Sequence, residues 1–119
     1  MTTAEASVSD MLVTVKSREI QRGMQAEMRG DHATAARHLL AAAHLELVLA
    51  SDYESLRQSR LAFRSLLSAA SCFWQAGDAK QANRLFLDLK RRYRNRKVEI
   101  DDIQRELKAC AKGNGSIRT

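Results

Sequence analysis

The chain has no proline, five glycines and two cysteines, and aromatic residues make up only 5% of its 119 residues. All-β and loop-rich domains depend on residues that fix or reverse the backbone, so this scarcity favours helices. No apolar run reaches the roughly 18 residues that cross a bilayer, and residues 1–10 lack the basic lead and apolar segment of a secretory signal. Cys72 and Cys110 are therefore expected to be free thiols in a reducing compartment. These absences predict a cytoplasmic protein that does not associate with membranes.

Hydrophobic residues are 45% and charged residues 29% of the chain, which is the usage of an ordinary folded domain. A chain of this length buries enough apolar surface to fold as one domain without a metal or a disulfide. We predict a single domain over residues 8–112, preceded by a flexible N-terminus (1–7) and followed by a flexible tail (113–119).

Apolar residues recur at three- and four-residue steps along most of this domain, which is the period of an α-helix. Gly30-Asp31 and Gly77-Asp78 interrupt the pattern, and Ser51 with Glu54 makes a capping box that would begin a helix. Gly113 is expected to end the last helix. The sequence thus predicts an all-α fold whose five helices cover approximately residues 8–29, 31–50, 51–75, 78–93 and 98–112.

Two segments of the chain share one spacing of small, turn and apolar residues. The first is Gly23, Gly30-Asp31, Ala35, Leu39 and Ala42, and the second is Ala70, Gly77-Asp78, Ala82, Phe86 and Leu89. In each, glycine would close one helix, aspartate would cap the next, and small residues would let the two helices cross closely. Residues 17–95 therefore resemble the tetratricopeptide repeat, with Phe73 and Leu66 at that family's aromatic positions.

This resemblance implies two antiparallel helical hairpins followed by a C-terminal capping helix. The two turns depart from the family pattern, because Gly30 and Gly77 are 47 positions apart and the family's repeat is about 34 residues long. An ordinary antiparallel helical bundle stays open as the alternative.

The resemblance also implies a non-catalytic adaptor that binds a peptide or an amphipathic helix in an apolar groove. Flexible methionines and a tryptophan edge suit such a protein partner. The groove positions are Ile20, Met24, Glu27 and Met28 in the first repeat and Arg64, Leu67, Ser71 and Trp74 in the second. Glu27 and Arg64 are expected to orient the partner. The same apolar residues are typical of a core, which is the alternative, and pairing of two copies of the chain is left open.

The net charge of +6, from 20 Lys and Arg against 14 Asp and Glu, is local. Outside one basic patch the balance is 14 against 14. The patch consists of Lys90, Arg91, Arg92, Arg94, Arg96 and Lys97. Such a cluster can hold phosphates, so a small RNA- or nucleic-acid-interacting protein is the alternative function, although the dipole also favours cations at a helix C-terminus. Nucleic acid is the less favoured partner, because acidic residues follow directly from Glu99 to Glu106.

A catalytic form of that alternative depends on Arg37 and His44, which lie seven positions apart and share one helical face. The pair resembles the Arg-His motif of HEPN-type ribonucleases, in which the arginine would stabilise charge on the reacting phosphate and the histidine would move a proton. His32, His38 and His44 are spaced by six and share no face, so they predict no metal site. The favoured interpretation has no catalytic residue, metal or cofactor.

Overall fold

A computed structural model describes the backbone of residues 7–118 and the side chains of residues 7–110. Over the described residues the chain forms five α-helices, which confirms the predicted all-α fold. They are α1 (Val8–Met28), α2 (His32–Ser55), α3 (Ser59–Gln75), α4 (Ala79–Arg92) and α5 (Lys97–Arg118), with a 3₁₀ turn, η1 (Arg94–Arg96), before α5. Most of the predicted flexible N-terminus, residues 1–6, lies outside this part of the chain, as does Thr119.

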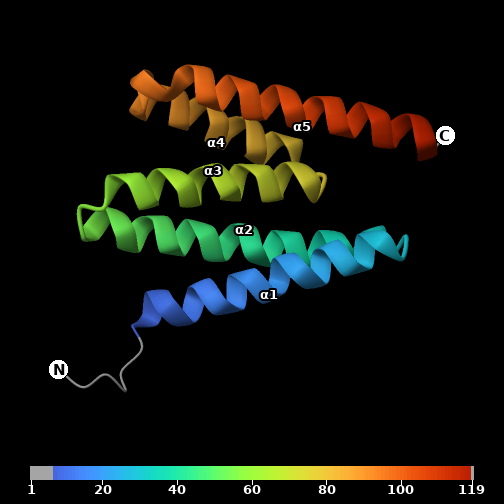
Figure 1. Ribbon diagram of the computed structural model, residues 1–119, viewed down its shortest axis with the longest axis horizontal. Coiled ribbons are helices and arrows are strands. Elements are labelled where there is room, and N and C mark those ends of the chain that lie inside the picture. Colours follow the sequence, from blue (N-terminus) through green and yellow to red (C-terminus); the bar gives the residue numbers. More distant parts are fainter. Residues whose placement is uncertain (1–6, 119) are drawn as a thin grey trace.

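Consecutive helices run antiparallel, and together they form a flat body of 56 × 34 × 17 Å (Figure 1). α2 lies between α1 and α3 and contacts both, whereas no Cα of α1 comes within 8 Å of α3 or α5. α3 also contacts α4 and α5, which lie on the side of the array away from α1. The helices of the two expected hairpins are therefore arranged side by side, with α5 packed on the second hairpin.

Each of the first three interhelical corners ends its helix in the same way, with one residue in the left-handed region. Gly30 has φ +78° and Gly77 has φ +92°, as expected from the Gly-Asp turns. At each of these corners the next residue, Asp31 or Asp78, donates its backbone N–H to a carbonyl five residues back, at 2.9 Å. The Asp31 and Asp78 carboxylates then accept the backbone N–H groups three residues ahead and cap α2 and α4.

The corner between α2 and α3 lies at Arg57, not at Ser51 as the sequence predicted. Arg57 has φ +58°, and the N–H of Gln58 reaches the carbonyl of Tyr53 at 2.8 Å, so this corner has the hydrogen bonds of the two glycine corners. Ser51 is inside α2. The predicted capping box is wrong because helical packing continues through it, and the turn uses an arginine in a conformation that normally selects glycine.

The last helix also differs from its prediction, because α5 continues to Arg118 and passes the expected stop at Gly113. A glycine can end a helix or be tolerated within one, and here the backbone stays helical through it. The predicted tail, 113–119, falls on residues whose side chains lie outside the described part of the chain.

The core joins α2, α3, α4 and the first turn of α5. Its largest fully buried side chains are Phe63, Phe73, Phe86, Leu49, Leu89 and Ile100. Buried alanines occupy the helix contacts, and a Cβ placed on Gly23 would lie 3.1 Å from Leu39 Cγ, so α1 and α2 cross closely at this glycine. The small residues of the repeated pattern therefore do allow close helix approach.

Polar contacts hold α1 against α2 over most of its length. His38 Nδ1 lies 2.7 Å from Glu19 Oε2, Lys16 Nζ lies 3.7 Å from Glu46 Oε2, and the Ser9 hydroxyl donates to Asp52. The hydrogen bond with His38 holds the pKa of the Glu19 carboxyl below its usual value of 4.5. The folded protein is thus stabilised by an ionised Glu19.

We expect Glu19→Gln to lower the free energy of unfolding by about 1 kcal/mol at neutral pH. A carboxyl whose pKa is lowered by folding stabilises the protein above its unfolded pKa, and this contribution disappears as the pH falls through the folded pKa. Urea unfolding at pH 7 and pH 3 should therefore show a difference from the wild type only at pH 7. Glu106→Gln, which removes a carboxylate without a described hydrogen bond, is the control. An equal difference at both pH values would contradict the role of Glu19.

Candidate functional site

A groove of about 780 Å³ opens at one end of the helical array. At this end the α1–α2 corner and α5 extend beyond the α3–α4 corner (Figure 1). One wall is α1, with Gly23, Met24, Glu27 and Met28, and the opposite wall is α5, with Ile103, Glu106, Leu107 and Cys110. The floor is formed by Leu39, Trp74, Gln75, Gly77 and Ala79. We call this site the end groove.

Large apolar side chains remain exposed along the α1 wall of the end groove. Met24 is 60% exposed and Met28 is 86% exposed, although the adjacent Gly23 and Ala26 are buried. Methionine is flexible and polarisable, so it adapts to apolar partners of different shape. The α1 wall therefore presents adaptable apolar surface to a concave site, not merely scattered exposed residues.

Trp74 both contributes to the floor of the end groove and anchors α5 to α3. Its Nε1–H donates to the carbonyl oxygen of Leu107 at 3.2 Å, which ties α3 to α5. Its ring is partly buried and packs against the core. Because Trp74 holds α5 in place, a substitution there would disturb the fold together with the groove, and Met24 is the better position for a functional test.

Among the residues with described side chains, the charged ones that line the end groove are two carboxylates, Glu27 and Glu106. Glu27 Oε1 lies 2.8 Å from His32 Nδ1, and both side chains are partly exposed. Glu106 is exposed and makes no ion pair within the described residues. The groove therefore combines apolar walls with local negative charge, in a chain whose net charge is +6.

The structure brings four of the eight predicted groove residues to this cavity and places the other four outside it. Met24, Glu27, Met28 and Trp74 lie at the C-terminal ends of α1 and α3 and line the groove. The four outside lie earlier in the same two helices: Ile20 and Leu67 pack against the core, Ser71 Oγ donates to the carbonyl of Leu67 at 3.0 Å, and Arg64 is exposed. The charged side chain on the wall opposite Glu27 is therefore that of Glu106, because Arg64 does not line the groove.

The α5 wall is the part of the site that the sequence interpretation missed. Ile103, Leu107 and Cys110 lie on one face of α5, the helix that was expected only to cap the two hairpins. It does pack on the core at Ile100, but it continues beyond the end of α3 and α4 into the groove.

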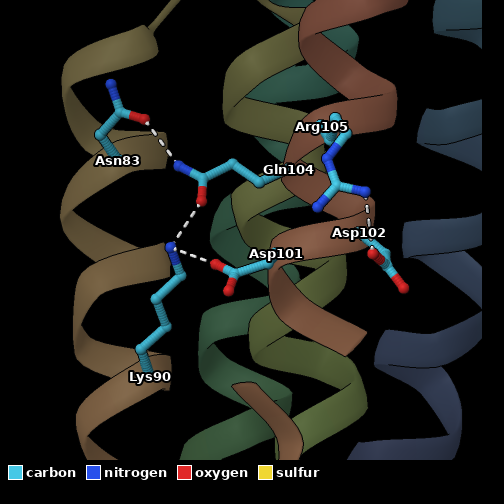
Figure 2. Close-up of polar contacts among 6 residues, drawn as sticks. All are labelled: Asn83, Lys90, Asp101, Asp102, Gln104 and Arg105. Atoms are coloured by element: carbon cyan, nitrogen blue, oxygen red, sulfur yellow. Dashed lines mark hydrogen bonds and ion pairs between the residues drawn. The ribbon is translucent and has the colours of Figure 1, made fainter. Parts of the chain in front are cut away.

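Half of the basic patch is engaged in ion pairs within the fold. Lys90 Nζ lies 2.7 Å from Asp101 Oδ1 and 2.8 Å from Gln104 Oε1, so it joins α4 to α5 (Figure 2). Arg92 Nη2 lies 2.6 Å from Glu54 Oε1. Arg96 Nη1 lies 3.7 Å from Glu99 Oε2, and the guanidinium of Arg96 lies over the ring of Phe63. Lys90 lowers the pKa of Asp101, and Glu54 raises that of Arg92, as such pairs require.

The other three cations of the basic patch, Arg91, Arg94 and Lys97, are exposed and make no ion pair with the described residues. They alternate along the chain with the paired cations. The patch is therefore a mixed surface of free and neutralised cations instead of a continuous positive one.

The other side chains with possible chemistry, Arg37, His44 and Cys72, do not line the end groove. Arg37 and His44 are exposed on α2, and the His44 ring packs edge-on against Phe73 with centroids 5.3 Å apart. Cys72 is buried, and burial raises the pKa of its thiol to about 11, which makes it a poor nucleophile. Among residues 7–110, whose side chains are described, no group of three or more His, Cys, Asp or Glu side chains is suited to a metal.

None of the described helices is both long enough and apolar enough to span a membrane. Comparison of the chain with protein-family models, with curated proteins and with solved structures finds no match in any of them.

Proposed function

We propose that the protein is a non-catalytic interaction adaptor that binds an amphipathic helix or apolar peptide of a partner protein in the end groove. The observation that carries this proposal is the exposure of Met24 and Met28 on the wall of a concave, mainly apolar cavity. Apolar surface in such a site gains free energy when a partner covers it.

The shape of the groove favours a helical ligand. Its two walls are helices, α1 and α5, and helices pack by inserting side chains of one into the spaces between side chains of the other. The described residues form no β-strand, so they offer no sheet edge to which an extended peptide could add. An amphipathic helix would place its apolar face on the floor and keep its polar face in solvent.

The resemblance to tetratricopeptide repeats supports the proposal as far as the hairpin corners go. Both Gly-Asp corners reverse the chain, and the small residues pack as that pattern implies. The groove differs from the one inferred by resemblance, since α2 separates α1 from α3 and α5 supplies the second wall. A relation of the two hairpins to that family is therefore part of this proposal.

Met24→Glu is expected to weaken ligand binding at least roughly tenfold, because a carboxylate placed in an apolar contact must lose water on binding. Amphipathic helices of about 18 residues, displayed on phage, are first selected on the wild-type protein. The affinity of the selected helices is then measured for the wild type, for Met24→Glu and for a control variant. Met11→Glu is the matched control, since Met11 lies in the same helix, is 59% exposed and does not line the groove.

Two results would contradict the adaptor proposal. One is the failure of any displayed helix to enrich above a surface without protein. The other is equal binding of the selected helices to the wild type, Met24→Glu and Met11→Glu, which would place their binding site away from the groove.

The nucleic-acid alternative, with a ribonuclease built on Arg37 and His44 as its catalytic form, is the second candidate. The three exposed cations Arg91, Arg94 and Lys97 favour it. It has less support than the adaptor, because the other half of the basic patch is paired and neither Arg37 nor His44 lines the end groove.

A further inference from the structure

We propose that the chain has a second binding site, at the end of the array opposite the end groove, which binds the phosphate backbone of a nucleic acid without reading its base sequence. This site would act alongside the end groove, with which it shares no residue. It is formed where the corner between α2 and α3 and the corner between α4 and α5 come together at one end of the array (Figure 1).

Three contacts hold these two corners against each other. Arg92 Nη2 lies 2.6 Å from Glu54 Oε1, which joins the end of α4 to the end of α2. The Arg96 guanidinium lies over the ring of Phe63, 4.6 Å from its centroid, and the Tyr93 ring packs on the same ring with centroids 4.9 Å apart. Cations that are distant in the sequence therefore belong to one surface.

Six cations on this surface, which we call the basic end, are free of ion pairs. Three come from the α2–α3 corner and the first two turns of α3, and three come from the last turn of α4 and the start of α5. All six are exposed, and no described carboxylate pairs with them. They are Arg57, Arg60, Arg64, Arg91, Arg94 and Lys97.

The carboxylates at this end leave the six cations uncompensated, because other cations already hold them. Lys90, Arg92 and Arg96 are the cations that do so. The four pairs are Arg92–Glu54, Arg92–Asp88, Lys90–Asp101 and Arg96–Glu99. Positive charge therefore remains at the basic end, and a nucleic acid that covers it gains free energy by releasing its condensed counterions.

Arg57 gives independent support for a ligand at this surface. Its φ is +58°, whereas the two other corners of this type have glycine, which adopts such a conformation without strain. The Arg57 side chain makes no hydrogen bond or ion pair with the described residues, so nothing in the fold offsets the strain. An arginine in a glycine conformation, without a partner inside the protein, is accounted for by a ligand outside it.

The composition of the basic end suits phosphate groups. Five of its six free cations are arginine, whose planar guanidinium can donate two parallel hydrogen bonds to one phosphate. The aromatic residues at this end, Tyr53, Phe63 and Tyr93, are buried or half-buried, so none of them offers a ring on which a base could stack. Contacts to phosphates alone carry no sequence information, and binding is therefore expected to be independent of sequence.

An anionic bilayer is the competing ligand, because Leu56 and Val98 are exposed beside the cations. Binding at a bilayer surface commonly uses a helix that lies flat, with its apolar face in the lipid. At the basic end the helices meet solvent with their ends instead (Figure 1). A duplex, which carries one charge per roughly 1.7 Å, is the better match for a surface of separated cations.

Fluorescence anisotropy with labelled DNA duplexes of two unrelated sequences tests this site. The wild type is expected to bind both duplexes equally, with a dissociation constant on the order of 1 µM at low salt. The logarithm of its affinity should fall against the logarithm of salt concentration with a slope of about −5, as expected for five or six phosphate contacts.

Three triple variants, each of which removes three positive charges, locate the binding surface. The α2–α3 variant and the α4–α5 variant replace the three free cations of one corner with glutamine. The control variant replaces Arg18, Arg29 and Lys80, which are exposed away from the basic end. Each corner variant should weaken binding at least about tenfold and bring the salt slope close to −2, whereas the control should change the affinity less than about twofold.

Arg57→Gly separates ligand binding from folding. Because glycine adopts a positive φ without strain, the midpoint of thermal unfolding should not fall. Binding to the duplexes should weaken about threefold, and the salt slope should lose about one unit. A lower midpoint would show that the Arg57 side chain supports the corner itself, and would overturn its assignment to ligand binding.

Four results would overturn the proposal. The first is the absence of salt-dependent binding of the wild type to the duplexes. The second is a loss in the α4–α5 variant alone, which would separate the two corners. Equal losses in all three triple variants would indicate attraction by net charge only. Tighter binding to vesicles of phosphatidylcholine and phosphatidylserine, weakened in both corner variants, would assign the basic end to a bilayer. The adaptor function is unaffected by these results, because Met24→Glu tests it at the other end of the molecule.

Discussion

Replacing Phe73 with alanine is expected to lower the free energy of unfolding by about 4 kcal/mol. The ring is 1% exposed and belongs to the core that α2, α3, α4 and α5 share. Its edge contact with His44 would be lost as well. The surrounding helices are held by tight corners, so they cannot collapse fully into the space that the ring leaves. The remaining cavity therefore costs free energy in addition to the apolar burial that is lost.

Urea unfolding and thermal melting, followed by circular dichroism, measure this change. The midpoint of melting should fall by on the order of 20 °C. Phe73→Leu fills most of the same space and should cost about 1.5 kcal/mol, whereas Leu87→Ala, on the exposed side of α4, should cost less than about 0.5 kcal/mol. Equal losses for Phe73→Ala and Leu87→Ala would show that Phe73 is not in the shared core.

Lys16→Met is expected to cost about 3 kcal/mol, which is large for the removal of one surface charge. Its partner Glu46 is 3% exposed on α2, and Lys16 Nζ reaches it from α1 at 3.7 Å. Without the lysine the carboxylate remains buried between the helices with its opposite charge removed. The helix that carries the Met24 wall of the end groove is therefore held partly by this ion pair.

A second substitution distinguishes a buried charge from lost packing. Lys16→Met/Glu46→Leu removes both charges, so it should recover most of the stability that Lys16→Met loses. Arg105→Met, which breaks an exposed pair with Asp102, should cost about 0.5 kcal/mol or less. Urea unfolding at neutral pH gives all three values. If the double variant is no more stable than Lys16→Met, the charge of Glu46 is not the cause.

The glycine corners could be predicted because their chemistry is local. A left-handed residue at Gly30 or Gly77 and a capping carboxylate one position later require only a few neighbouring residues. The corner at Arg57 has the same backbone hydrogen bonds, but it has neither the glycine nor a side-chain cap. The nearby Ser51 and Glu54 offered a better local match, so the boundary was predicted six positions too early.

Four of the eight residues predicted for a groove line the end groove, for a reason that follows from helix geometry. Periodicity shows which residues share a face of one helix, and it correctly grouped Met24 with Met28. It does not show how far along that face the neighbouring helices extend. Ile20 and Leu67 were grouped with the groove, yet they pack against the core.

Local sequence was thus sufficient for the helical class, the two glycine corners and their aspartate caps, because these depend on backbone conformation within about one helical turn. Packing between distant segments decided the rest. It placed α2 between α1 and α3, and it set α5 opposite α1 with Glu106 facing the same cavity as Glu27. A groove is space that no neighbour fills, and only the arrangement of all the helices determines where such space remains.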